Sequence, residues 1–103
     1  MRFDGKTIWI TGASSGIGRA VALRLSKENT HLILTDINEP GLKEVATACE
    51  KNKCTTLVVP MDLSDEKSVV AAAQSILDKN IKIDGLYQFA GISQRSLVSE
   101  TPL

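Results

Sequence analysis

A glycine-rich turn near the N-terminus contains the residues with the clearest chemical meaning. Between Thr11 and Gly18 the glycines recur at the spacing G-x-x-x-G-x-G. Glycine allows a tight turn and lets a ligand touch the backbone, where a Cβ would stand in the way. Free N–H groups at the start of a helix, with the helix dipole behind them, attract an anion such as a diphosphate. The residues that we expect to form this anion site are Gly12, Ser14, Ser15, Gly16, Ile17 and Gly18, the two serines adding hydroxyl donors.

An acid, Asp36, ends the next apolar run, close to the distance of about 20 residues from the turn at which a ribose-binding carboxylate is expected. A carboxylate there accepts hydrogen bonds from the 2′- and 3′-hydroxyls of an adenosine ribose and repels a 2′-phosphate. Neither Ser15 nor Ile37 is the Arg or Lys that a 2′-phosphate would favour, so the sequence favours NAD over NADP as cofactor. The alternative is that Asp36 merely precedes a helix that Asn38 caps.

The elements that must position these residues alternate along the chain. Short β-branched runs predict strands at residues 7–11, 32–35, 55–59 and 85–90, and helical periodicity fills the intervals between them. Strands joined by helical crossovers form a parallel sheet, so the sequence predicts a doubly wound α/β fold of Rossmann type with strand order 3-2-1-4. The loops that leave the first and fourth strands then flank one crevice at the carboxyl edge. This context favours a ligand site over a plain loop for the glycine-rich turn.

The helices are placed by their apolar stripes and by their capping residues. Asn38 is the predicted N-cap of the second helix and Ser64 that of the third. The predicted buried positions are Ile17, Ala20, Val21 and Leu25 in the first helix, Leu42, Val45, Ala46 and Cys49 in the second, and Val69, Ala72, Ala73 and Ile76 in the third.

Composition narrows the classes of protein. Twelve basic residues balance twelve acidic ones among 103, which leaves no basic field for nucleic acid or a membrane surface. An apolar content of 43% is typical of a globular chain, and no apolar run is long enough to span a bilayer. Two cysteines, Cys49 and Cys54, are too few for a disulfide framework or a zinc site, so we expect reduced thiols in a cytoplasmic protein. The lone histidine, His31, is predicted at the surface at the start of the second strand.

The chain resembles the short-chain dehydrogenases/reductases over nearly its whole length. Residues 11–18 match the TGxxxGxG turn of that family. The pair Asp62 and Leu63 is similar to the family's Asp-Leu pair after the third strand, which implies that the Asp62 side chain meets the adenine amine while the backbone of Leu63 lies beside the ring. The alternative for Asp62 is a loop acid just ahead of the Ser64 cap.

The fourth predicted strand resembles the family strand that ends in Asn-Asn-Ala-Gly. Gln88 and Phe89 replace the two asparagines, whereas Ala90 and Gly91 remain, which implies that the backbone still approaches the nicotinamide ribose closely. Residues 91–97 also resemble the subgroup of that family called dehydrogenase/reductase member 7.

The resemblance implies hydride transfer between a nicotinamide and a carbonyl or alcohol substrate, with a Tyr-x-x-x-Lys pair and a preceding Ser as catalytic residues. Tyr87 instead lies in a predicted strand, and Lys82 precedes it. We therefore predict no catalytic residue and no metal site, and interpret residues 1–103 as a single partial NAD(P)-binding domain that lacks the later strands and helices. The alternatives are a non-catalytic nucleotide-binding module and a non-functional truncated product.

An incomplete sheet leaves apolar surface uncovered. Only the third helix is expected on one face, and the fourth strand, with Leu86, Tyr87 and Phe89, is expected to form an unpaired edge. The sequence therefore predicts either a fragment or self-association through the uncovered sheet face and the strand-four edge.

Overall fold

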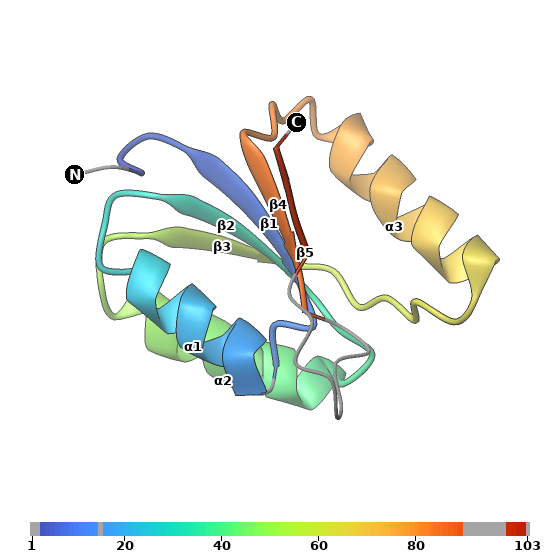
Figure 1. The fold of residues 1–103 in the computed structure, drawn as a ribbon, viewed down its shortest axis with the longest axis horizontal. Coiled ribbons are helices and arrows are strands. Elements are labelled where there is room, and N and C mark those ends of the chain that lie inside the picture. Colours follow the sequence, from blue (N-terminus) through green and yellow to red (C-terminus); the bar gives the residue numbers. More distant parts are fainter. Residues whose placement is uncertain (1–2, 15, 90–98, 103) are drawn as a thin grey trace.

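The fold is a twisted sheet with helices on both faces (Figure 1), and the computed structural model describes residues 3–14, 16–89 and 99–102. The sheet has the order β3-β2-β1-β4-β5. Its first four strands run parallel, which confirms the predicted doubly wound α/β fold and the order 3-2-1-4. The strands are β1 (Thr7–Thr11), β2 (His31–Thr35), β3 (Thr55–Val58), β4 (Gly85–Gln88) and β5 (Ser99–Pro102).

The strand β5 was not predicted, and it changes one expectation. It pairs antiparallel with β4, so that Leu86 lies opposite Thr101 and Tyr87 opposite Glu100. The prediction of an unpaired edge at the fourth strand is therefore wrong. The sequence Ser-Glu-Thr-Pro has no apolar alternation and carries little strand signal, so only the backbone pairing with β4 reveals this strand.

Two helices pack on one face of the sheet and one on the other, as expected (Figure 1). The first pair, α1 (Gly16–Leu25) and α2 (Glu39–Glu50), encloses the larger core, while α3 (Glu66–Asp78) encloses the smaller one. Central strand residues such as Ile10, Leu32 and Leu34 are fully buried, which explains the lack of polar alternation in β1 and β2.

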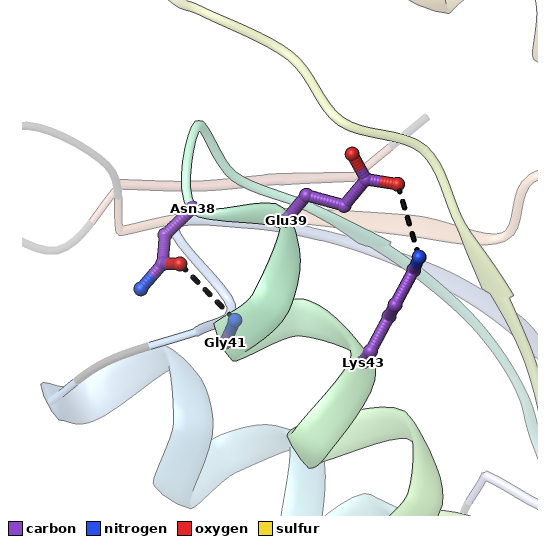
Figure 2. Close-up of polar contacts among 4 residues, drawn as sticks. All are labelled: Asn38, Glu39, Gly41 and Lys43. Atoms are coloured by element: carbon purple, nitrogen blue, oxygen red, sulfur yellow. Dashed lines mark hydrogen bonds and ion pairs between the residues drawn. The ribbon is translucent and has the colours of Figure 1, made fainter.

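The helix α2 has the buried face that the sequence predicts. Leu42, Val45, Ala46 and Cys49 are all buried. Asn38 caps the helix, its Oδ1 accepting from the Gly41 amide at 3.1 Å (Figure 2). The periodic stripe and the N-cap together indicated this helix correctly.

The predicted stripe of α1 is wrong in most of its members. The residues that face the sheet are Gly18, Ala22 and Leu25, whereas Ile17 is 44% exposed. The helix is rotated because the Gly18 backbone lies directly against Gly12, a contact that hydrophobicity does not reveal. Ile17, Ala20 and Val21 instead line an apolar hollow of about 450 Å³ together with Phe3, Arg24, Leu25, Tyr87 and Phe89.

The helix α3 also differs from its prediction at the N-terminus. Asp65, rather than Ser64, is the N-cap, and its side chain accepts from the Lys67 amide at 3.1 Å. Ala72 and Ile76 are buried as predicted, but Val69 and Ala73 are only half-buried.

The remaining predicted surface and core positions are as expected. Cys49 and Cys54 are free and buried, and burial raises the pKa of both thiols, that of Cys54 to about 11. His31 is exposed at the start of β2, with its Nδ1 at 2.5 Å from the Thr55 hydroxyl.

Candidate functional site

The glycine-rich turn connects β1 to α1 at the carboxyl edge of the sheet. Gly12 and Gly16 have φ angles of +72° and +54°, a region where glycine is strongly favoured. Gly18 is needed for a different reason, because a Cβ there would lie 2.0 Å from the Gly12 carbonyl oxygen. Two of the glycines therefore shape the turn, and the third lets the helix start close to the strand.

Three backbone hydrogen bonds continue past the strand ends and join the segments that follow four strands into one rim. The Gly12 amide donates to Thr35 O at 2.9 Å, and the Met61 amide donates to Asp36 O at 2.9 Å. On the other side, the Phe89 amide donates to Thr11 O at 2.9 Å. The residues that follow β1, β2, β3 and β4 thus lie at one edge, as parallel strands require.

The amides at the start of the turn already have protein acceptors. Gly12 and Ala13 both donate to Thr35 O, at 2.9 and 3.2 Å, and the Ser14 amide donates to Asp36 Oδ2 at 3.1 Å. Of the predicted anion-site residues, Gly12 and Ser14 therefore do not offer free amides to a diphosphate, because the end of β2 and Asp36 lie beside them.

The amides in the first turn of α1, unlike those of the residues before it, have no protein acceptor in the part of the chain that the structure describes. The amides of Gly16, Ile17 and Gly18 have no acceptor within the helix, since the first four N–H groups of a helix lack one. No backbone acceptor outside the helix bonds them within the described ranges. The amides left without a protein acceptor are thus those at the helix start, where the dipole acts.

Asp36 lies at the centre of this rim and is partly buried. Its Oδ2 accepts from the Ser14 amide and, at 2.7 Å, from the Ser14 hydroxyl, while its Oδ1 accepts from the Asn38 amide at 3.3 Å. Burial acts to raise the pKa of Asp36, but these hydrogen bonds outweigh it and hold the pKa below its ordinary value. The carboxylate is therefore ionised at neutral pH. Oδ2 already accepts two hydrogen bonds, whereas Oδ1 accepts one from Asn38 and keeps capacity for a further donor.

Asn38 does cap α2, as the alternative interpretation of Asp36 required. Both features coexist, because the cap uses the Asn38 side chain and the contact with Asp36 uses its backbone amide. Helix capping therefore does not account for the position of Asp36 beside Ser14.

The other predicted site residues after β2 and β3 are exposed or half-buried at the same rim. Ile37 is 68% exposed and Leu63 is 38% exposed. Asp62 accepts at Oδ1 from the Ser64 amide and hydroxyl, and these bonds lower its pKa. The loop interpretation of Asp62 is supported by that contact, and the Met61–Asp36 bond nevertheless keeps Asp62 beside the Asp36 loop.

Three predicted site residues, Ser15, Ala90 and Gly91, lie outside the described residues, as does the stretch 91–97. Tyr87 lies in β4, as predicted, and stacks on Phe89 with ring centroids 6.3 Å apart. Within the described ranges, no group of three or more His, Cys, Asp or Glu residues could hold a metal ion. The helices in those ranges are all too short or too polar to cross a membrane.

Sequence reasoning missed three residues of this rim. Thr11 is 4% exposed, and its hydroxyl has no partner in the described part of the chain. Thr35 accepts from Trp9 Nε1 at 3.0 Å and donates to Ile10 O at 3.3 Å. Gly41 lies against Ser14, since a Cβ on Gly41 would lie 3.0 Å from the Ser14 Cβ. Only Thr11 carried a sequence signal, since it opens the TGxxxGxG motif.

Comparison with known proteins decides the family. The family model described as "short chain dehydrogenase" matches residues 6–103. The chain belongs to the short-chain dehydrogenase family. Among the relatives of this chain is "Dehydrogenase/reductase SDR family member 7" of Mus musculus, which is 43% identical over 93% of this chain and 30% of the relative. The chain thus spans about a third of the length of this curated relative.

Solved structures of a dehydrogenase and a reductase have the same fold. NAD+-bound xylitol dehydrogenase is similar with a TM-score of 0.77 and 31% identity, over 84% of this chain and 33% of that one. L-sorbose reductase from Gluconobacter frateurii, solved with NADPH and L-sorbose, has a TM-score of 0.74 and 34% identity, over 82% of this chain and 32% of that one. Nicotinamide cofactors are thus common to the family, and both NAD and NADP occur among these neighbours.

Proposed function

We propose that residues 1–103 form the dinucleotide-binding part of an NAD-dependent short-chain oxidoreductase. The whole protein would transfer hydride between the nicotinamide and the carbon of a carbonyl or alcohol substrate. The observation that carries the cofactor assignment is the partly buried Asp36 carboxylate, which Ser14 orients beside the start of α1.

The proposed cofactor follows the rim of the sheet. Its diphosphate rests on the free amides at Gly16, Ile17 and Gly18, and Asp36 accepts hydrogen bonds from the adenosine ribose. The Ser14 hydroxyl donates its single hydrogen bond to Asp36. Its proposed role is therefore to orient the carboxylate. The residues assigned to the two ends of the cofactor are Asp62 and Leu63 at the adenine, and Ala90 and Gly91 at the nicotinamide ribose. Gly12 shapes the turn, and Ser15 remains a proposed hydroxyl donor.

The preference for NAD over NADP rests on charge. An ionised carboxylate repels the 2′-phosphate of NADP, and Ile37, the next residue, is an exposed aliphatic side chain that offers no compensating cation. NADP binding would therefore bring two negative groups together in a partly buried place.

Hydride transfer itself is the chemistry that bound nicotinamide supplies. The residues proposed here bind and orient the cofactor, and we assign no catalytic role to Tyr87, which is part of β4 and stacks on Phe89.

The proposal also includes the oligomeric state of the chain and its cellular compartment. The apolar hollow between α1 and β4 and the face that α3 covers alone support self-association of the chain. Two buried free thiols support a reducing compartment such as the cytoplasm. Sedimentation over a range of concentrations tests the first, since a monomer at all of them contradicts it.

Titration with NADH tests cofactor binding directly. The chain has one tryptophan, Trp9, and energy transfer from it to bound NADH reports the complex. We expect saturable binding to the 103-residue chain, competition by NAD+, and affinity for NADPH lower by about tenfold. A chain with a folded circular dichroism spectrum but no NADH binding would contradict the proposal. Oxidation of an alcohol by the chain alone would exclude the non-enzymatic module.

A further inference from the structure

Gly41, in the first turn of α2, lies against two side chains that come from different loops. A Cβ on Gly41 would lie 2.7 Å from Asn38 Nδ2, 3.0 Å from Asn38 Cγ and 3.0 Å from Ser14 Cβ. Figure 2 shows the Asn38 side chain directed at the Gly41 amide, to which it is bonded at 3.1 Å. The φ angle of Gly41 is not positive, so space, rather than backbone conformation, favours glycine at this position.

The two neighbours of Gly41 are the same two residues that hold the Asp36 carboxylate. Ser14 binds Oδ2 through its amide and its hydroxyl, and the Asn38 amide binds Oδ1. Both hydrogen bonds to Oδ2 therefore come from Ser14, whose Cβ packs against Gly41, and one hydrogen bond to Oδ1 comes from the backbone of Asn38, whose side chain packs there too.

The geometry points to Gly41 as a positioning residue that sets the orientation of Asp36 toward the cofactor ribose, acting through Ser14 and Asn38. This inference rests on the proposed function and adds a determinant of cofactor affinity outside the residues that contact the cofactor. A methyl group at position 41 would displace the end of the Asn38 side chain. It would also force the Ser14 Cβ to shift by a few tenths of an ångström, which disturbs the hydrogen bonds from Ser14 to Asp36.

A role of Gly41 in helix stability and a role in positioning Asp36 predict different effects of Gly41→Ala on nucleotide binding. Alanine is a better helix residue than glycine, so Gly41→Ala would leave binding unchanged if the residue mattered only for α2. The positioning role predicts weaker binding instead.

The first experiment compares nucleotide affinities of the 103-residue chain. For Gly41→Ala we expect the Kd for NADH to rise about tenfold while that for NADPH changes much less, because only the diol needs the oriented carboxylate. The matched control is Glu44→Ala, an exposed position in the same helix, which should bind NADH as the wild type does. In the Gly41→Ala background, Asn38→Gly removes the crowding at Asn38 and should recover part of the affinity.

The second experiment needs no nucleotide. Hydrogen exchange of the Ser14 amide, whose acceptor is Asp36, should accelerate in Gly41→Ala by about fivefold or more relative to the Gly12 amide, whose acceptor is Thr35. Unchanged Ser14 exchange overturns the inference, whatever the affinities are. Accelerated exchange in a chain whose wild type binds no NADH supports the contact with Asp36 and overturns the proposed function alone. If Gly41→Ala does not fold, Ser14→Ala decides: unchanged NADH affinity in that variant overturns the inference.

Discussion

Ser14 donates two hydrogen bonds, from its amide at 3.1 Å and from its hydroxyl at 2.7 Å, to the same Oδ2 atom of Asp36. One residue of the β1–α1 turn thus fixes the acid that follows β2. This link couples the proposed anion site to the proposed ribose site, so a change in either residue should affect cofactor binding.

Replacing Asp36 by arginine should reverse the cofactor preference. We expect Asp36→Arg to weaken NADH binding about tenfold and to favour NADPH relatively, because a guanidinium attracts the 2′-phosphate that the carboxylate repels. Competitive titration of the two reduced cofactors measures the ratio. An unchanged ratio would remove Asp36 from the ribose site, and Glu44→Ala is again the control.

Acid should destabilise the fold partly through Asp36. Its pKa is lower in the folded chain than in the unfolded chain, so the unfolded state takes up the proton first as the pH falls. This contribution is fully present above the ordinary Asp pKa and is lost as the pH drops below about 4. Urea denaturation at a series of pH values should show a smaller acid loss for Asp36→Asn and an intermediate one for Ser14→Ala. A variant profile parallel to that of the wild type would contradict the role of these hydrogen bonds.

Gly18→Ala should destabilise the chain strongly. The added Cβ would lie 2.0 Å from a backbone oxygen, which cannot rotate away as a side chain can, so α1 must shift from the turn. We expect a loss of about 1–3 kcal/mol in the free energy of unfolding. Gly85→Ala is the matched control, since its Cβ would meet only the Ile8 side chain at 3.4 Å. Equal losses in the two variants would be inconsistent with the Gly12–Gly18 contact.

Both thiols should resist modification in the folded chain. Cys49 and Cys54 are buried, and burial raises the pKa of each, so little thiolate forms near neutral pH. We expect a thiol reagent to label them only at the rate of local or global opening, and both rapidly in denaturant. Fast labelling under native conditions would show that the end of α2 opens readily.

The parts of the fold that the sequence predicted correctly are those where burial follows a regular period. The run at residues 7–11 is β1, and the stripe from Leu42 to Cys49 is the buried face of α2. These signals are local and repeat over several residues, so they survive without knowledge of the tertiary contacts. The motif and spacing likewise predicted that Asp36 lies beside the turn, although not which atoms bind it.

The errors occur where a single contact between distant residues decides the result. The Gly12–Gly18 approach rotates α1 and exposes Ile17, which periodicity placed in the core. Thr35 O binds the Gly12 and Ala13 amides that the motif appeared to leave free for phosphate. The Thr35 contact has no signature in the sequence, because backbone groups form it. The glycine at position 18 permits the other contact, but hydrophobic periodicity does not take it into account.

Three backbone hydrogen bonds beyond the strand ends affect the free energy of ligand binding. They join Gly12 to Thr35, Met61 to Asp36, and Phe89 to Thr11. Loops held in this way lose their conformational entropy when the chain folds rather than when the cofactor arrives. A nucleotide that meets this rim therefore encounters a nearly rigid receptor, and its affinity should depend on direct contacts with little penalty for ordering the protein.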